Sequence, residues 1–411
     1  MKSPNVRVTN WNEANIGGSP NNIITGIETE DVLNVNVVGA VNPTNPTEKV
    51  NYEPILPKTM PVPFEKINAS GTKIRHLTKD GVLYGAKTAD GRLHKSADFG
   101  ETWVPLATTP AGAQVHKFTD GKLLVIARNG KTYLSDEAEE NFTLVYDFDT
   151  AIGEAFGMDV HGDMVFISSY AGNNYDRCFM SFDQGATWKQ ILQHPDPSIS
   201  HFHDIAYDPY ENIVWACSGD YGVKDNIFYS NDFGETWETT YGIPDLNVRA
   251  TAIIPLPKCV LFVSDTNGSM FVWRYDRHPE GTQGHQVIPY KAWFHKRNIP
   301  LDKNDFVGSK PAITYGAESS ALFGWHAYNP GGNVTPAVVI ATKDGYSFTT
   351  IWSSGELMNP SNTNYVDGGL MGVFGPTDKN EYVAYYTKGD KDNLTAVPSR
   401  YAVKINFPGW G

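Results

Sequence analysis

A motif of eight residues constrains the fold of this chain more than any other feature. The chain contains three copies of it, with the pattern S-x-D-x-G-x-T-W. Its shared positions are Ser96, Asp98, Gly100 and Trp103, then Ser181, Asp183, Gly185 and Trp188, then Ser230, Asp232, Gly234 and Trp237. Ser and Asp side chains accept hydrogen bonds from the backbone N–H groups of a tight turn, and Gly supplies the positive φ that such a turn needs. Thr and Trp then favour a strand, so each copy predicts a hairpin with a Trp ring buried between sheets.

This pattern is the Asp-box, and on it the chain resembles the sialidase-like β-propeller family that carries the Asp-box, or BNR, repeat. The resemblance implies a ring of blades with the boxes at the periphery, away from any catalytic centre. We therefore interpret Asp98, Asp183 and Asp232 as structural residues that stabilise their turns. Their spacing agrees, because carboxylates placed one per blade cannot converge on one substrate as the paired acids of glycosidases do.

The spacing of the copies also predicts the number of blades. A blade of about 40–50 residues requires a further copy between the first two, and a degraded one starts at Ser135, with another at Asp344 and Gly345. The last unit lacks an outer strand, and the alternating run 61–67 can supply it. We therefore expect an all-β, seven-bladed β-propeller of four-stranded antiparallel blades over 61–411, closed by 61–67, with six blades as the alternative. The repeating units run over 73–106, 113–146, 154–192, 201–240, 247–293, 311–353 and 367–407.

Residues 1–60 differ in composition, being rich in Asn, Pro, Thr and Val and lacking an Asp-box. Prolines favour an extended chain that cannot pair with itself, so this segment is expected to be an extended N-terminal arm. Such an arm becomes ordered when a partner subunit, or its own propeller, tethers it. An Asn/Val-rich arm before a large β domain also looks like the virion proteins of tailed bacteriophages, a resemblance in layout alone.

Charge and cysteine content argue against several partners and cofactors. The 411 residues carry a formal net charge of -13 with no run of Lys or Arg, which disfavours nucleic acid and anionic membranes as partners. We expect no signal peptide and no membrane insertion, since no stretch has the apolar length for either. Cys178, Cys217 and Cys259 lie in apolar runs and are expected to be buried, without a disulfide framework. No cofactor is expected.

The densest group of candidate ligands lies between residues 201 and 220. On an inner strand His201 and His203 share one face and Asp204 lies on the other, while Asp220 ends the next strand on the same rim. Two His and one or two Asp have the chemistry to bind a divalent metal or a sugar. In the structural alternative, the histidines satisfy polar groups buried in the channel and Asp220 caps a turn. Whether a metal binds here is left open.

Loop aromatics and two arginines form further ligand candidates. Tyr170 and Tyr221 lie on long loops after equivalent strands of neighbouring blades, and Trp325 follows a later strand. Exposed aromatics on one rim are how such folds stack on sugars or grip proteins. Arg75 and Arg249 begin inner strands and are placed to point at the central channel. Sialidases of the resembled family carry an Arg-Ile-Pro and an arginine triad, and this chain has no Arg-Ile-Pro and no evident third arginine.

Three functions stay open from the sequence. The first is a non-catalytic virion protein, assembled in the host cytoplasm as part of a phage tail or capsid. Its arm would join other virion proteins in a homo-oligomeric or larger assembly, and its propeller would recognise host-surface carbohydrate or a neighbouring virion protein. The second is a sialidase-like or other glycoside hydrolase, and the third is a propeller-type assembly factor. The arm, the lack of a signal and the incomplete sialidase motif favour the first, a structural attachment protein over an enzyme.

Overall fold

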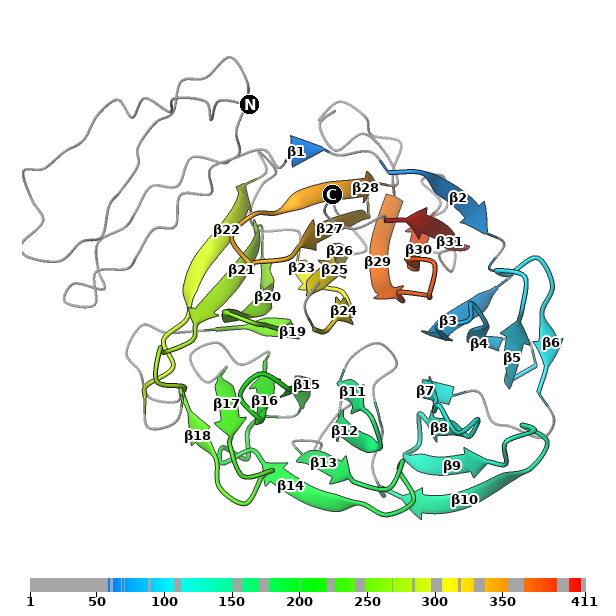
Figure 1. The fold of residues 1–411 in the computed structure, drawn as a ribbon, viewed down its shortest axis with the longest axis horizontal. Coiled ribbons are helices and arrows are strands. Elements are labelled where there is room, and N and C mark those ends of the chain that lie inside the picture. Colours follow the sequence, from blue (N-terminus) through cyan, green and yellow to red (C-terminus); the bar gives the residue numbers. More distant parts are fainter. Residues whose placement is uncertain are drawn as a thin grey trace, which may run out of the picture.

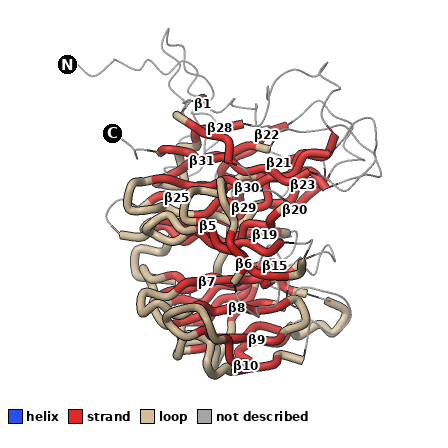
Figure 2. The backbone as a smooth tube through the Cα atoms, turned by 90° about the vertical axis from the view of Figure 1, so that its right-hand side faces the viewer, coloured by secondary structure: helices blue, strands red, loops and turns tan. Residues whose placement is uncertain are grey.

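The computed structural model shows a ring of β-strands around a centre, and no helix occurs among the residues that it describes (Figure 1; Figure 2). The part of the chain outside these residues includes nearly all of the expected arm over 1–60. Within the described part, no helix has the length and apolar character needed to cross a membrane. The described residues are 58–59, 62–67, 69, 71–87, 90–106, 112–149, 152, 157–169, 177–199, 201–219, 226–240, 248–267, 269–282, 285–296, 305–316, 319–328, 337–353, 366–389 and 399–407.

Blades I to V each contain four antiparallel strands that follow the chain from the centre outward. Blade I contains β3 (Thr72–Leu77), β4 (Leu83–Lys87), β5 (Arg92–Ser96) and β6 (Val104–Pro105). Blade II contains β7 (Gly112–Lys117), β8 (Leu123–Ala127), β9 (Lys131–Ser135) and β10 (Phe142–Asp147), and blade III contains β11 (Met158–His161), β12 (Met164–Ser168), β13 (Arg177–Ser181) and β14 (Lys189–Gln193). Blade IV contains β15 (Phe202–Asp208), β16 (Ile213–Ser218), β17 (Ile227–Ser230) and β18 (Glu238–Thr239), and blade V contains β19 (Ala250–Leu256), β20 (Cys259–Asn267), β21 (Ser269–Asp276) and β22 (Tyr290–Lys296).

The last two blades include strands from the N-terminal side of the chain. Blade VI contains β24 (Ala312–Thr314), β25 (Ser320–Phe323), β27 (Val338–Thr342) and β28 (Thr349–Ser353), with β1 (Lys58–Thr59) parallel to β28 at its edge. Blade VII contains β29 (Val366–Phe374), β30 (Glu381–Gly389) and β31 (Ser399–Asn406), and its fourth strand is β2 (Phe64–Ile67). Phe64 lies opposite Ile405 in this antiparallel pair. The fold is therefore a seven-bladed β-propeller, as predicted, and the six-bladed alternative is wrong.

Among the described residues, seven apolar clusters fill the interfaces between neighbouring blades, and each contains residues of two blades. Between blades III and IV, for example, Phe166 packs with Phe228. The cluster that joins Ile74 of blade I to Tyr385 of blade VII completes the circle. Each fully buried Ile or Phe contributes about 1.5–3 kcal/mol, so the blade interfaces hold the ring together. The three cysteines are buried, as expected.

Blades V and VII are also joined by hydrogen bonds, which the repeat did not predict. The end of β20 pairs with β23 (Asp305–Gly308), β23 pairs with β26 (Trp325–Tyr328), and β26 pairs with β29. Gly324 lies where the chain leaves β25 in blade VI and becomes β26. A Cβ on Gly324 would lie 1.9 Å from the carbonyl oxygen of Val338, so only glycine permits this change of partner.

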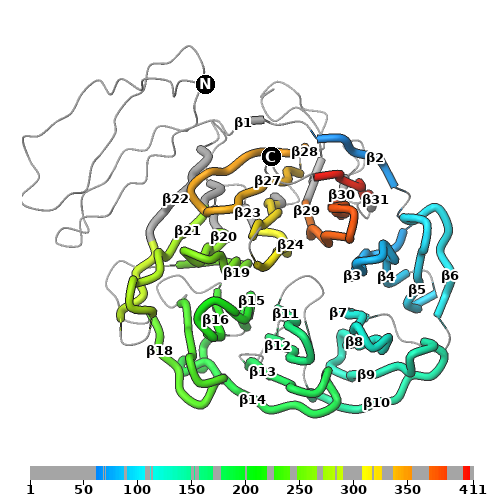
Figure 3. Tube along the Cα trace, in the orientation of Figure 1, coloured from blue at the N-terminus to red at the C-terminus, as the bar shows by residue number. Residues whose placement is uncertain are grey.

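The Asp-box turns have the hydrogen bonds that the pattern predicts. Oδ1 of Asp98 accepts a bond from the Thr102 N–H at 2.9 Å, and Oγ of Ser96 accepts one from the Gly100 N–H at 2.7 Å. The Thr102 hydroxyl, followed by its N–H, lowers the pKa of Asp98 to about 2. Equivalent bonds form at Asp183 and Asp232. All three boxes follow the third strand of a blade, toward the outer edge of the ring (Figure 3).

Each box also places its Trp in the apolar cluster shared with the preceding blade. Trp103, Trp188 and Trp237 pack between blades VII and I, II and III, and III and IV. The indole N–H of Trp237 donates to the carbonyl oxygen of Ile191 at 2.7 Å across the blade boundary. The box therefore braces a turn and joins two blades, which are structural roles.

The degraded copies of the Asp-box keep the hydrogen bonds between the aspartate and the turn, although other residues of the motif are replaced. In blade II, Oδ1 of Asp136 accepts the Glu140 N–H at 2.9 Å, and Oδ2 accepts the Asn141 side-chain amide at 2.6 Å. In blade VI, Oδ1 of Asp344 accepts the Tyr346 N–H at 2.8 Å. The aspartate therefore still stabilises the turn where the other residues of the motif have changed.

Candidate functional site

A cavity of about 980 Å³ occupies the centre of the ring. The innermost strands surround this centre (Figure 3). The cavity lining also includes Lys79, Gly121 and Asp378, which lie on turns that follow inner strands, and we call this end of the cavity its mouth. Its volume is at the upper end of the roughly 300–1,000 Å³ typical of ligand pockets. The titratable and phenolic side chains on its wall are His76, Lys117, Asp159, His116, His161, Asp204, Lys310, Tyr84 and Tyr315.

Bulges in the innermost strands shape the wall. In blades I, IV and V the register between the first two strands shifts by one residue, and the extra residues are Arg75, His203 and Thr251. The same shift occurs in blade II between Gly112 and Gln114. A bulge bends its strand and turns a side chain away from the regular alternation. Two residues singled out in the sequence, Arg75 and His203, therefore occupy equivalent bulge positions.

Lys310 lies at the wall of the cavity between blades VI and VII. Its carbonyl oxygen accepts the Val373 N–H at 2.9 Å, which fixes the backbone there. Its side chain is half-buried and forms no hydrogen bond within the described part of the chain. Burial lowers the pKa of Lys310, and the charges of Asp204 and Asp159 act in the opposite direction. The ammonium group is thus available to an acceptor on a ligand.

Asp159 and Asp204 face the same cavity and connect neighbouring blades. Oδ1 of Asp204 accepts the Gly157 N–H of blade III at 3.2 Å, and Oδ2 accepts the Ile253 N–H of blade V at 2.9 Å. Oδ2 of Asp159 accepts the Tyr207 N–H of blade IV at 2.8 Å. Burial raises the pKa of both carboxyls, that of Asp204 to about 7, although these N–H groups favour the charged form. Both acids therefore serve as ties between blades.

His76 and His116 supply neutral polar groups on the wall. The rings of His76 and His116 are 4.7 Å apart. Burial, with the positive charge of Lys310 as a further cause, lowers the pKa of both, that of His116 to about 3. His161 packs edge-on against Tyr315 at 5.4 Å. A neutral imidazole both donates and accepts hydrogen bonds, so His76 and His116 offer both kinds of partner to a ligand in the cavity.

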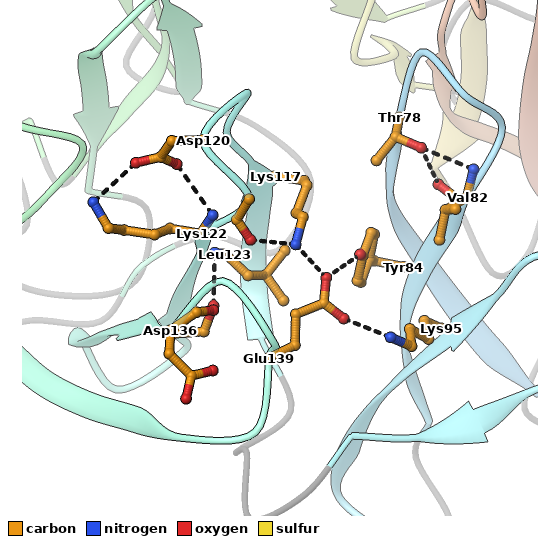
Figure 4. Close-up of polar contacts among 12 residues, drawn as sticks. Thr78, Val82, Tyr84, Lys95, Lys117, Asp120, Lys122, Leu123, Asp136 and Glu139 are labelled. Carbon is orange, nitrogen blue, oxygen red and sulfur yellow. Dashed lines mark hydrogen bonds and ion pairs between the residues drawn. The ribbon is translucent and has the colours of Figure 1, made fainter.

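Glu139 holds blades I and II together beside the cavity (Figure 4). Its carboxylate accepts bonds from the Tyr84 hydroxyl at 2.5 Å, from Nζ of Lys117 at 2.5 Å and from Nζ of Lys95 at 2.8 Å. Lys117 also donates to the carbonyl oxygen of Gly121. Because Tyr84 and Lys117 line the cavity, this buried carboxylate fixes part of the wall.

His201 and His203 belong to a separate polar cluster. Nδ1 of His203 lies 2.7 Å from the carbonyl oxygen of Ala250 and donates to it. The Nε2 atoms of His201 and His203 are 3.1 Å apart, so one imidazole donates to the other. Asp265 lies 3.9 Å from Nε2 of His203 and accepts from Nε of Arg249 at 3.1 Å. These contacts use both ring nitrogens of His203.

The structure brings His201, His203 and Arg249 into one cluster through Asp265 and places the other described candidates apart from it. Asp204 contacts backbone N–H groups of blades III and V and not the two histidines, whereas Arg75 lies near enough to Lys310 to affect its pKa. The rim position expected for Trp325 is wrong, because this residue is 1% exposed and packs against Phe323 between blades V and VI. Asp220, Tyr170 and Tyr221 lie outside the described residues.

Sequence reasoning missed Lys310 and Asp159. Each is a single residue in its own unit, within neither a motif nor a charged run. Only the ring places blades III, IV and VI around one centre, so no local signal marks these residues.

The fold and the cavity together define the class of the protein: a seven-bladed β-propeller with Asp-box hairpins and a central cavity lined by both apolar and titratable side chains. The BNR/Asp-box repeat matches residues 228–239, which contain the third box. No curated protein matches the sequence.

Several solved structures share the fold. YCF48 from Cyanidioschyzon merolae superposes with a TM-score of 0.53 at 11% identity, covering 84% of this chain and 98% of that one. A structure of YCF48 bound to D1 peptide has a TM-score of 0.52 at 11% identity, covering 85% and 97%. The β-propeller domain of Cps50 (Swd1) from Myceliophteria thermophila has a TM-score of 0.52 at 9% identity, covering 84% and 99%. At these identities the likeness establishes the fold alone.

Proposed function

We propose that this chain is a non-catalytic recognition protein whose central cavity binds a segment of a partner protein. The observation that carries the proposal is Lys310, an ammonium group on the cavity wall without a hydrogen bond in the described part of the chain. A charged group in this position forms strong hydrogen bonds with a carboxylate or carbonyl oxygen from a ligand. The preferred ligand is therefore a chain segment that presents such an oxygen to Lys310.

The two acids on the wall support binding over catalysis. Asp159 and Asp204 accept backbone N–H groups from neighbouring blades, so their oxygens already have partners. The three Asp-box carboxylates are held by their own turns. A wall of fixed donors and acceptors is suited to recognition, because its groups do not have to be reorganised on binding.

The comparisons give this proposal a precedent in fold. One propeller with this architecture, YCF48, has been solved with a peptide bound. Propellers serve many functions, so the precedent supports a binding or assembly role and leaves the partner open. The predicted phage tail or capsid location, attachment through the arm to virion proteins, and recognition of host carbohydrate have no support from these comparisons and stay predictions.

Photo-crosslinking from the mouth of the cavity tests the proposal. The variant Lys79→p-benzoylphenylalanine places a reactive group at the mouth, on an exposed residue. Irradiation in the protein's own host should yield one discrete crosslinked protein, identifiable by mass spectrometry. The matched control, Glu101→p-benzoylphenylalanine, carries the group on the exposed turn of the first Asp-box and should not yield that species. The same product from both positions, or none from Lys79, would count against the cavity.

A glycoside hydrolase is the second candidate, on one specific observation. The pKa of Asp204 is raised to about 7 by burial, beside the second carboxyl of Asp159, as in an acid of a glycosidase pair. We nevertheless expect no hydrolysis of fluorogenic sialosides or glucans above the buffer rate. Robust turnover that disappears in folded Arg75→Ala and Arg249→Ala variants would overturn this expectation and favour the hydrolase.

A further inference from the structure

The outer hairpin of blade V departs from the Asp-box design. It joins β21 to β22, at the place where blades I, III and IV carry an Asp-box (Figure 1). Its sequence from His278 to His285 is HPEGTQGH, which has no S-x-D-x-G pattern. The aspartate brace of the intact boxes is therefore missing from this sequence, and other groups must hold the turn.

Three side chains of this hairpin gather at one point. Ligand atoms of His278, Glu280 and His285 all lie within 4.8 Å of one another. The two imidazole rings are stacked, with centroids 3.5 Å apart and planes 13° from parallel. The lone pair of an imidazole nitrogen lies in the plane of its ring, so one of the two rings turns out of this stack when both bind one ion, and each binds it in the neutral form.

The backbone of the hairpin is anchored around these side chains. The Gly281 N–H donates to the carbonyl oxygen of His278 at 2.9 Å, and the Tyr229 hydroxyl donates to that of His285 at 3.1 Å. The hydroxyl of Thr282, between the two histidines, donates to the carboxylate of Glu211. Groups held in place by such contacts lose little freedom when they bind an ion, which strengthens binding.

The donor set indicates the class of ion. Two imidazole nitrogens and one carboxylate oxygen suit borderline transition metals such as Zn²⁺, whereas Ca²⁺ and Mg²⁺ prefer oxygen ligands alone. Three protein ligands leave a position of the tetrahedral Zn²⁺ shell for water. The Glu280 N–H lies 3.3 Å from Nδ1 of His278, a long hydrogen bond that an ion on this nitrogen would replace.

We propose that His278, Glu280 and His285 form a zinc site that braces the outer hairpin of blade V, where an Asp-box braces the hairpins of other blades. The ion would link the two ends of the turn, the task that Asp98 performs through hydrogen bonds in blade I. This site lies on the outer hairpin and does not depend on the function of the central cavity.

Zinc titration of the untagged, chelator-treated protein tests the site. Isothermal titration calorimetry at pH 7.5 should show one Zn²⁺ per chain, and the same titration with Mg²⁺ should show no binding. The variant His278→Ala/His285→Ala should weaken the affinity for Zn²⁺ by more than the roughly 10–100-fold that loss of an outer-shell partner costs. The matched control, Glu101→Gln, removes an exposed acid from the Asp-box turn of blade I and should bind as the unchanged protein does.

A second readout separates the site from other histidines. Zinc should slow hydrogen exchange of the amides within 277–289 in the unchanged protein and leave their exchange unaltered in the double variant. Failure to bind one equivalent, equal affinity in the double variant, or bound zinc without protection of this hairpin would each overturn the proposal.

Discussion

Deleting residues 1–67 will leave a chain that no longer forms a stable closed ring, whereas deleting residues 1–57 will leave a folded propeller. The longer deletion removes β2, whose four residues pair with β31 in blade VII. It also removes Val62, which is 7% exposed and belongs to the cluster between blades VI and VII. Loss of Val62 burial costs about 1.5–3 kcal/mol, and each lost backbone hydrogen bond costs a further 0.5–1.5 kcal/mol or so. β31 would then present an unpaired edge that favours aggregation.

Size-exclusion chromatography with light scattering, together with thermal melting followed by circular dichroism, measures both deletions. The 1–67 deletion should melt at a lower temperature or elute as aggregate. An unchanged melting temperature would show that β2 is dispensable. Unfolding of the 1–57 deletion would show that the fold needs these residues, against the predicted boundary near residue 60. A partner lost only on this shorter deletion would support the arm as an anchor.

Replacing Arg277 with Ala will lower the free energy of unfolding by about 3–5 kcal/mol, the usual effect of breaking a buried ion pair. Nη1 of Arg277 lies 2.5 Å from Oδ2 of Asp208 and 3.0 Å from Oε2 of Glu211. Its Nε and Nη2 both donate to the carbonyl oxygen of Leu256. Asp208 is fully buried in blade IV and Arg277 follows β21 of blade V, so the pair connects two blades.

The loss in free energy of unfolding caused by Arg277→Ala should increase with pH. Burial raises the pKa of Asp208 even though Arg277 acts to lower it, so removing Arg277 raises this pKa further. A carboxyl whose pKa is higher in the folded state than in the unfolded state loses its stabilising effect as the pH rises through the folded-state pKa. Urea denaturation should therefore show a larger loss at pH 8 than at pH 5.

Lys189→Ala is the matched control for Arg277→Ala. Lys189 and Glu235 also connect two blades, at 2.5 Å, but their side chains are 54% and 69% exposed. Exposed ion pairs contribute roughly 0–1 kcal/mol, so this variant should unfold almost as the unchanged protein does. Equal effects of the two variants would contradict the importance assigned to burial.

The fold could be predicted from the sequence because its signals are local. Each Asp-box joins Ser, Asp and Gly within a few residues, and the substituted copies at Asp136 and Asp344 keep enough of the turn chemistry to mark their blades. The extra strands β23 and β26 gave no such signal. They form because Gly324 lets the chain change pairing partner, and this change also buries Trp325, which had been expected on the rim.

The cavity could not be predicted in the same way because its residues meet only after the ring closes. Lys310, Asp159 and Asp204 come from three different parts of the ring, and Lys310 and Asp159 lie in no motif that marks them in the sequence. The bulges at Arg75 and His203 add a second difficulty, because a bulge shifts the two-residue alternation on which a sequence-based prediction of faces relies.

The most direct test of the central claim is the affinity of Lys310→Met for the segment identified by crosslinking. A hydrogen bond to a charged group contributes about 1.5–3 kcal/mol, which corresponds to a loss of affinity of roughly tenfold to a hundredfold. Fluorescence anisotropy with the labelled segment should show this loss in Lys310→Met, while Lys189→Met binds as the unchanged protein does. Circular dichroism and the melting temperature must show that Lys310→Met is folded. Unchanged affinity in that folded variant would contradict binding through the central cavity.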